Sequence, residues 1–106
     1  MNWILPISLL IVFEVVADIL AKEWSLNRPV VFAVGAILAY VVANTFWLFA
    51  LKNGSGLAKG AVIFSVASAI CASVLGIVFY GEKLNMLQLA GVFFGIISLV
   101  LIFWEI

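Results

Sequence analysis

Long apolar runs occupy most of the chain, and short polar segments separate them. The polar segments lie at residues 23–28, 52–56 and 81–85. Each apolar run is about 20 residues long, which is the length that an α-helix needs to cross the hydrocarbon core of a bilayer. We therefore expect four transmembrane helices, over residues 3–22, 29–51, 57–80 and 86–104.

The polarity within these runs favours helices over membrane-spanning strands. A transmembrane β-strand alternates apolar and polar residues over about ten positions, whereas these runs are longer and continuously apolar. Pro29 is a favourable first-turn residue and Asn85 a favourable N-cap, so each marks the start of a helix. The chain is predicted to be an all-α membrane protein, with one four-helix transmembrane domain over residues 1–106.

Composition narrows the functional class. Hydrophobic residues make up 68% of the chain and charged residues 9%, too few to coat a soluble domain of this size. The formal net charge is zero and histidine is absent, so no basic patch for nucleic acid is expected. No phosphate-binding loop, zinc-ligand spacing or nucleophile triad occurs in the sequence. We expect a multi-pass protein of a prokaryotic plasma membrane, neither an enzyme nor a cofactor or metal binder.

Charge at the predicted loops leaves the orientation in the membrane open. Lys22, Arg28 and Lys83 share one side of the predicted bundle, and Lys52 and Lys59 share the other. Three against two is a small bias for the positive-inside rule. The chain could insert both ways, which would permit an antiparallel homodimer, or insert one way with a small preference.

Two acids, Glu14 and Asp18, interrupt the first apolar run. A charge near the bilayer centre costs roughly 2.5–3.5 kcal/mol, and the four-residue spacing puts both carboxylates on one helical face. Neither ionises cheaply without a cation, so the pair can hold protons until a cation arrives. This is the minimum chemistry of proton-coupled cation export. Alternatively, Asp18 pairs with Lys22, or Glu14 is a neutral, hydrogen-bonded structural acid.

Further candidate binding residues lie on the second and third predicted helices. Tyr40, Asn44 and Trp47 are spaced four and three apart, so they share one face and offer hydrogen bonds and an aromatic surface for a cation. The alternative is hydrogen bonding between helices. Phe64 and Ser65 lie where the third helix, rich in small residues, could face the acids.

A glycine pair on the fourth predicted helix suggests self-association. Gly91 and Gly95 form a G-x-x-x-G pattern, which allows two membrane helices to approach closely. A single chain of four helices can hardly enclose a path across the membrane, so we expect the protein to function as a dimer.

The chain resembles the small multidrug resistance family of the drug/metabolite transporter superfamily, over almost its full length. The resemblance rests on the four-helix layout and on these residues: Phe13-Glu14-Val15-Val16, Lys22, Tyr40, Phe46-Trp47, Ser65 and Phe79-Tyr80-Gly81-Glu82-Lys83-Leu84. It implies a homodimer, often antiparallel, in which Glu14 binds protons and cationic substrates in turn. It further implies substrate contacts from Tyr40 and Trp47 and subunit contacts near Gly91 and Gly95.

Departures from the family pattern identify a divergent member. Asp18 stands where the family usually has a neutral residue, and Ala17 where the guanidinium-exporting branch carries a tryptophan. The positions that match the family's aromatic and glycine pattern in the third helix are Ala61, Phe64, Val66 and Ser68.

These observations lead to a main functional hypothesis and two alternatives. The main hypothesis is a dimeric secondary transporter that exchanges protons for a small organic cation, with Asp18 as a second anionic point that could favour a dication such as a polyamine. The first alternative is a carrier of another small metabolite. The second is a non-transporting helical partner of another membrane protein. The choice between a homodimer and a paired heterodimer stays open.

Overall fold

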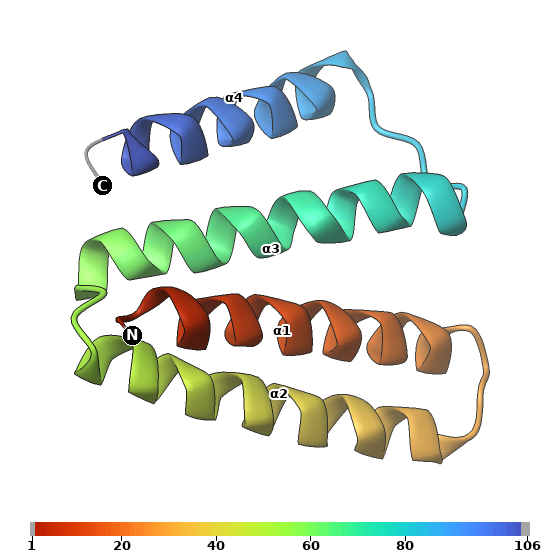
Figure 1. The fold of residues 1–106 in the computed structure, drawn as a ribbon. Coiled ribbons are helices and arrows are strands. Elements are labelled where there is room, and N and C mark those ends of the chain that lie inside the picture. The colour runs from red at the N-terminus through yellow and green to blue at the C-terminus, as the bar shows by residue number, and fades with distance from the viewer. Residues whose placement is uncertain (1, 105–106) are drawn as a thin grey trace. The chain divides into compact units, whose positions relative to one another are not determined.

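The computed structural model describes residues 2–104 and contains the four predicted helices in the predicted order (Figure 1). Their bounds are α1 Ile4–Ser25, α2 Val30–Lys52, α3 Leu57–Phe79 and α4 Met86–Phe103. All four are long and apolar enough to cross a membrane. The prediction of four membrane-spanning helices is therefore confirmed, and the largest difference is at the end of α1, which continues three residues beyond the predicted Lys22.

The turn between α1 and α2 explains where both helices stop and start. Asn27 has a φ of 67°, a left-handed conformation that breaks the helix, and its N–H donates to the carbonyl of Trp24. Pro29 follows with an extended ψ of 155° and serves as the N-cap of α2. α2 thus begins directly after Pro29, one residue from the approximate start expected at residue 29, because the extended backbone of Pro29 ends just before the helix.

The start of α4 follows the sequence signal closely. The Asn85 side chain accepts a hydrogen bond from the backbone N–H of Gln88, and the Gln88 side chain accepts one from the backbone N–H of Asn85, both at 2.9 Å. This reciprocal pair is a capping box, which satisfies two N–H groups that the first turn of a helix leaves without partners. The prediction of Asn85 as an N-cap is confirmed.

The chain divides into two compact units, which we call the N-terminal unit, Met1–Gly60, and the C-terminal unit, Ala61–Ile106. The N-terminal unit contains α1 and α2, which pack against each other as a helical hairpin (Figure 1). The C-terminal unit contains most of α3 and all of α4. Each unit is considered by itself below.

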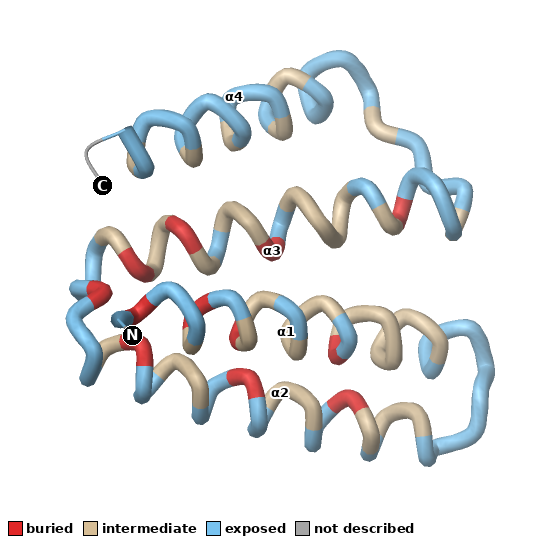
Figure 2. Tube along the Cα trace, viewed as in Figure 1, coloured by how far each residue is buried: buried red, intermediate tan, exposed pale blue. Residues whose placement is uncertain are grey.

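Small residues let the two helices of the hairpin approach closely. The buried residues of α2 are Ala36, Ala43 and Ala50, which repeat every seven positions and so follow one line along the helix (Figure 2). Gly35, next to Ala36, also approaches α1 closely, since a Cβ atom there would lie 3.5 Å from a methyl group of Leu20. The absence of bulky side chains on this line is what allows close backbone packing in a membrane.

The buried residues of α1 form a stripe that contains one of the two acids. Ile7, Leu10 and Ala17 are buried, as is Trp3 at the N-cap position just before the helix (Figure 2), with the spacing of one helical face. Glu14 is four residues after Leu10 and three before Ala17, so it occupies the position in this stripe where an apolar residue would be expected. It also lies at the middle of α1, the place where a charge is most costly in a bilayer.

In the C-terminal unit, glycines accommodate two close approaches. A Cβ on Gly95 of α4 would lie 3.4 Å from a Val66 methyl group of α3. A Cβ on Gly76 would lie 2.5 Å from a carboxylate oxygen of Glu82, whose backbone N–H also donates to the Gly76 carbonyl. The segment after α3 therefore folds back over the last turn of that helix, and the Glu82 carboxylate occupies the space that a Cβ atom at Gly76 would take.

Candidate functional site

The Glu14 carboxylate is the first element of the candidate site. Its Oε2 atom is buried and has no hydrogen-bond partner among the residues that the structure describes. A buried polar atom without a partner costs roughly 1–3 kcal/mol, and more when it is charged. A proton or a bound cation removes this cost, so Glu14 is the group in α1 best suited to take up either of them.

The second acid, Asp18, is in a different situation. The Tyr40 hydroxyl donates a hydrogen bond of 2.6 Å to Asp18 Oδ1, and this contact joins the middle of α2 to α1. The distance is at the short end of the range for O–H···O hydrogen bonds. The sequence showed that Tyr40 could donate to a carboxylate, and the structure identifies that carboxylate as Asp18.

The three candidate residues of α2 come together as predicted. Tyr40, Asn44 and Trp47 line one groove of about 620 Å³ on the surface of α2, and its other lining residues are Ile37, Val41, Thr45 and Leu48. The Asn44 amide donates to the carbonyl of Tyr40 at 2.9 Å, which holds that side chain along the helix. The lining is mostly apolar, with polar groups from Tyr40, Asn44, Thr45 and the indole of Trp47, as suits an organic ligand with few polar groups.

An aromatic pair also joins α1 to α2. The rings of Phe13 and Phe46 stack at 5.6 Å between centroids and 25° between planes. This contact and the Asp18–Tyr40 bond set the antiparallel register of the hairpin, which places Glu14 level with Asn44 and Thr45. Sequence reasoning did not assign a site role to Thr45 or to the Phe13–Phe46 stack, because neither follows from residue spacing within a single helix.

The remaining predicted residues lie in the C-terminal unit. Ser65, Gly91 and Gly95 line a groove of about 500 Å³ between α3 and α4, together with Val66, Ala69, Ile70, Ser73, Leu84, Gln88 and Val92. Gly95 faces α3 of its own chain, whereas a Cβ on Gly91 would meet no atom within 4 Å. Phe64 is half-buried on α3. The binding roles of Phe64 and Ser65, and the subunit contacts at the glycines, stay predictions.

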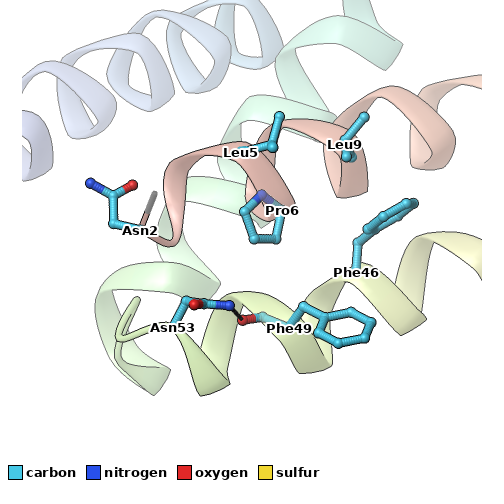
Figure 3. Close-up of a pocket in the computed structure, with 7 residues that line it drawn as sticks. All are labelled: Asn2, Leu5, Pro6, Leu9, Phe46, Phe49 and Asn53. Atoms are coloured by element: carbon cyan, nitrogen blue, oxygen red, sulfur yellow. Dashed lines mark hydrogen bonds between the residues drawn. The ribbon is translucent and has the colours of Figure 1, made fainter.

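Another cavity lies where α1 begins and α2 ends (Figure 3). It measures about 350 Å³ and is lined by Asn2, Leu5, Pro6, Leu9, Phe46, Phe49 and Asn53. The Asn53 amide is turned toward its own helix and donates to the Phe49 carbonyl at 2.7 Å (Figure 3). No ionisable side chain is present in this lining, so the cavity offers neither a proton carrier nor a counter-charge for a cation.

The described part of the chain, residues 2–104, contains no evident metal-binding site. Within it, no group of three or more histidine, cysteine, aspartate or glutamate side chains is placed to hold a metal ion. Glu14 and Asp18 remain the two acids of the membrane-spanning segments with a candidate role in ligand binding.

Comparison with known proteins identifies a transporter family. The EamA-like transporter family matches residues 3–104, which include all four helices. No curated protein and no solved structure matches the chain.

Proposed function

The chain belongs to the EamA-like transporter family, and from this premise we propose that it exchanges protons for small organic cations. The family is one of membrane transporters of the drug/metabolite type rather than of enzymes. With its four apolar helices, the protein is a multi-pass membrane protein. The cation specificity, the proton coupling and the dimer described below are parts of the proposal.

The observation that carries the proposal is the place of Glu14. Its carboxylate lies at the middle of a membrane-spanning helix, within the buried stripe, with Oε2 buried and unpartnered among the described residues. A proton or a cation bound to the carboxylate would each remove the energetic cost of this buried, unpartnered oxygen, and the two cannot bind at the same time. Competition between them couples the inward movement of a proton to the outward movement of a substrate.

The distribution of charge favours a cationic substrate over an anionic one. All five lysines and arginines of the chain lie in turns or in the terminal turns of helices, whereas Glu14 and Asp18 lie within α1. Lys59, in the first turn of α3, is already placed 4.9 Å from the centre of the Trp3 ring. A carrier of anions would need a cation near the middle of a helix, and none of these residues is there.

The groove on α2 supports an organic cation as the substrate. Tyr40 and Trp47 present aromatic surfaces, which attract organic cations and accept their apolar groups. Asn44 and Thr45, which also line the groove, add polar groups at the height of Glu14 in the hairpin register. A small ammonium or guanidinium compound with an apolar group fits this combination.

We further propose a homodimer, parallel or antiparallel, in a prokaryotic plasma membrane, and a place for the chain as a divergent member of the small multidrug resistance family. The residues around Glu14 and the segment Gly81–Leu84 support this finer assignment. A dimer would bring two copies of Glu14 to the path, and rocking of the two protomers about a site near the midplane would give alternating access.

The test is proton-coupled current in proteoliposomes containing the purified protein. Wild type, Glu14→Gln and the control Glu23→Gln are challenged with tetraethylammonium, guanidinium and putrescine. Glu23 suits as the control because it is an acid of the same helix that lies near its end, 3.4 Å from Arg28. We expect current with wild type and Glu23→Gln, and none with Glu14→Gln.

Two results would contradict the proposal. A Glu14→Gln variant with undiminished proton-coupled current would show that Glu14 is not the shared site. No current from folded, dimeric wild type with any of these cations would favour a carrier of another metabolite or a non-transporting partner.

A further inference from the structure

We propose that Asp18 is a positioning residue for Tyr40, and that this pair determines which organic cations the groove on α2 accepts. The inference rests on the proposed function and deepens it. It replaces the expectation that Asp18 is a second cation-binding carboxylate that favours dications.

Tyr40 is the residue that joins the acid to the groove. Its hydroxyl donates to Asp18 Oδ1 at 2.6 Å, and its side chain lines the groove together with Asn44 and Trp47. A tyrosine side chain without a tether can change rotamer. The bond to Asp18 on the neighbouring helix holds the ring in one orientation and thereby sets the shape of one wall of the groove.

The two carboxylates differ in what they leave for a ligand. Asp18 already accepts a short hydrogen bond from Tyr40, whereas Glu14 has a buried oxygen with no partner among the described residues. A cation that bound directly to Asp18 would have to compete with that hydroxyl. Glu14 therefore presents the carboxylate of each protomer's site that a cation can bind directly without displacing a hydroxyl, and one such carboxylate favours a monovalent cation over a divalent one.

A purely structural bond would have different consequences. If the bond only held the hairpin together, its loss would lower stability and reduce the transport of every substrate by the same factor. If it positions Tyr40, its loss changes the ratio of KM values between bulky and small cations. That ratio is the readout that separates the two roles.

The experiment measures uptake by proteoliposomes of tetramethylammonium, benzyltrimethylammonium and putrescine, a small monocation, a bulky monocation and a dication. The variants are Tyr40→Phe, Asp18→Ala, their double mutant, and Asp18→Asn, which removes the charge but keeps an oxygen that can accept the hydroxyl. Ser8→Ala is the matched control, since it removes a hydroxyl of α1 that donates to the carbonyl of Ile4 on the same helix.

If Asp18 positions Tyr40, substitutions at the two residues should have coupled effects on the KM ratio. Tyr40→Phe and Asp18→Ala should each change the KM ratio of the two monocations by about 3- to 20-fold, the range expected for one hydrogen bond between membrane helices. The double mutant should change it no further than either single mutant. Asp18→Asn should retain the wild-type ratio, and so should Ser8→Ala.

Other results would overturn the proposal. Putrescine transport that is as fast as that of the monocations in wild type and lost in Asp18→Asn would make Asp18 a cation-binding carboxylate. If the effects of Tyr40→Phe and Asp18→Ala on the KM ratio multiply in the double mutant, the two residues act independently and Asp18 does not position Tyr40. If Asp18→Ala does not fold, the conservative variants still test the proposal. Tyr40→Phe should change the KM ratio of the two monocations, and Asp18→Asn should not.

Failure of the proposed function gives a separate result. If that proposal is wrong, wild type shows no proton-coupled cation uptake and the selectivity proposal falls with it. If only the present inference is wrong, wild type transports, Glu14→Gln does not, and the effects at Asp18 and Tyr40 are independent.

Discussion

Gly60 is predicted to control the position of Trp47, and its substitution gives a sharp test of the N-terminal unit. A Cβ atom on Gly60 would lie 2.8 Å from Ser55 Oγ and 3.1 Å from both Cη2 and Cζ3 of the Trp47 ring. Contacts below 3.0 Å require some atom to move. Ser55 is fully buried and the indole ring is rigid, so neither neighbour can yield easily.

Two opposing terms decide the sign of the effect of Gly60→Ala. Alanine improves helix propensity over glycine by about 0.8–1 kcal/mol, a gain that applies because Gly60 lies in the first turns of α3. Overpacking of a close-packed site costs about 1–3 kcal/mol. Because the obstructing atoms belong to a buried serine and an indole ring, the upper part of that range applies. We expect a net loss of about 1–2 kcal/mol in the free energy of unfolding.

Unfolding in mixed micelles, followed by circular dichroism and tryptophan emission, measures this loss. In proteoliposomes the same variant should have a higher KM for aromatic cations, because Trp47 lines the groove on α2. In a double-mutant cycle with Trp47→Leu, the cost of Gly60→Ala should fall by at least half. A Gly60→Ala variant as stable as wild type, with unchanged tryptophan emission, would refute this reasoning.

Three further predictions concern the C-terminal unit. Asn85→Ala should lower stability by about 0.5–2 kcal/mol through loss of the capping box, whereas Asn85→Ser should retain most of it; equal stability of the two variants in micelles would contradict the role of the cap. Gly76→Ala should displace the Glu82 side chain and cost at most about 1 kcal/mol, because a flexible chain end can move; Glu82→Ala should abolish that cost, and a cost that persists would place the obstruction elsewhere. Gly91→Ala meets no atom within 4 Å and should leave the stability of the monomer unchanged or raise it by up to about 1 kcal/mol; a weaker dimer in a concentration-dependent crosslinking assay would locate Gly91 at the subunit contact, and an unchanged dimer would remove it.

If the Asp18–Tyr40 bond persists through transport, the hairpin of α1 and α2 moves as one body. Its two helices are joined by this bond, by the Phe13–Phe46 stack and by the line of buried alanines on α2. Movement between the two faces of the membrane would then take place between hairpins rather than within one. A cysteine pair that joins α1 to α2 at positions outside the groove should therefore transport equally well when crosslinked and when reduced. Loss of transport on crosslinking would show that the two helices must separate.

The sequence by itself determined the membrane spans and the location of the acids. Run length and polarity are properties of single segments, so they predicted four helices without knowledge of any neighbour. The capping box at Asn85 is equally local, since its two partners are three residues apart. The shared face of Glu14 and Asp18, and that of Tyr40, Asn44 and Trp47, follow from helical spacing alone.

Only the tertiary structure decided how the two acids differ. Both are carboxylates on one face of α1, and nothing in their spacing distinguishes them. The register of the hairpin brings the Tyr40 hydroxyl to Asp18 and leaves an oxygen of Glu14 buried without a partner among the described residues. That register results from the packing of α1 against the alanine line of α2 and from contacts between residues more than 20 positions apart, which the periodicity of a single helix does not encode.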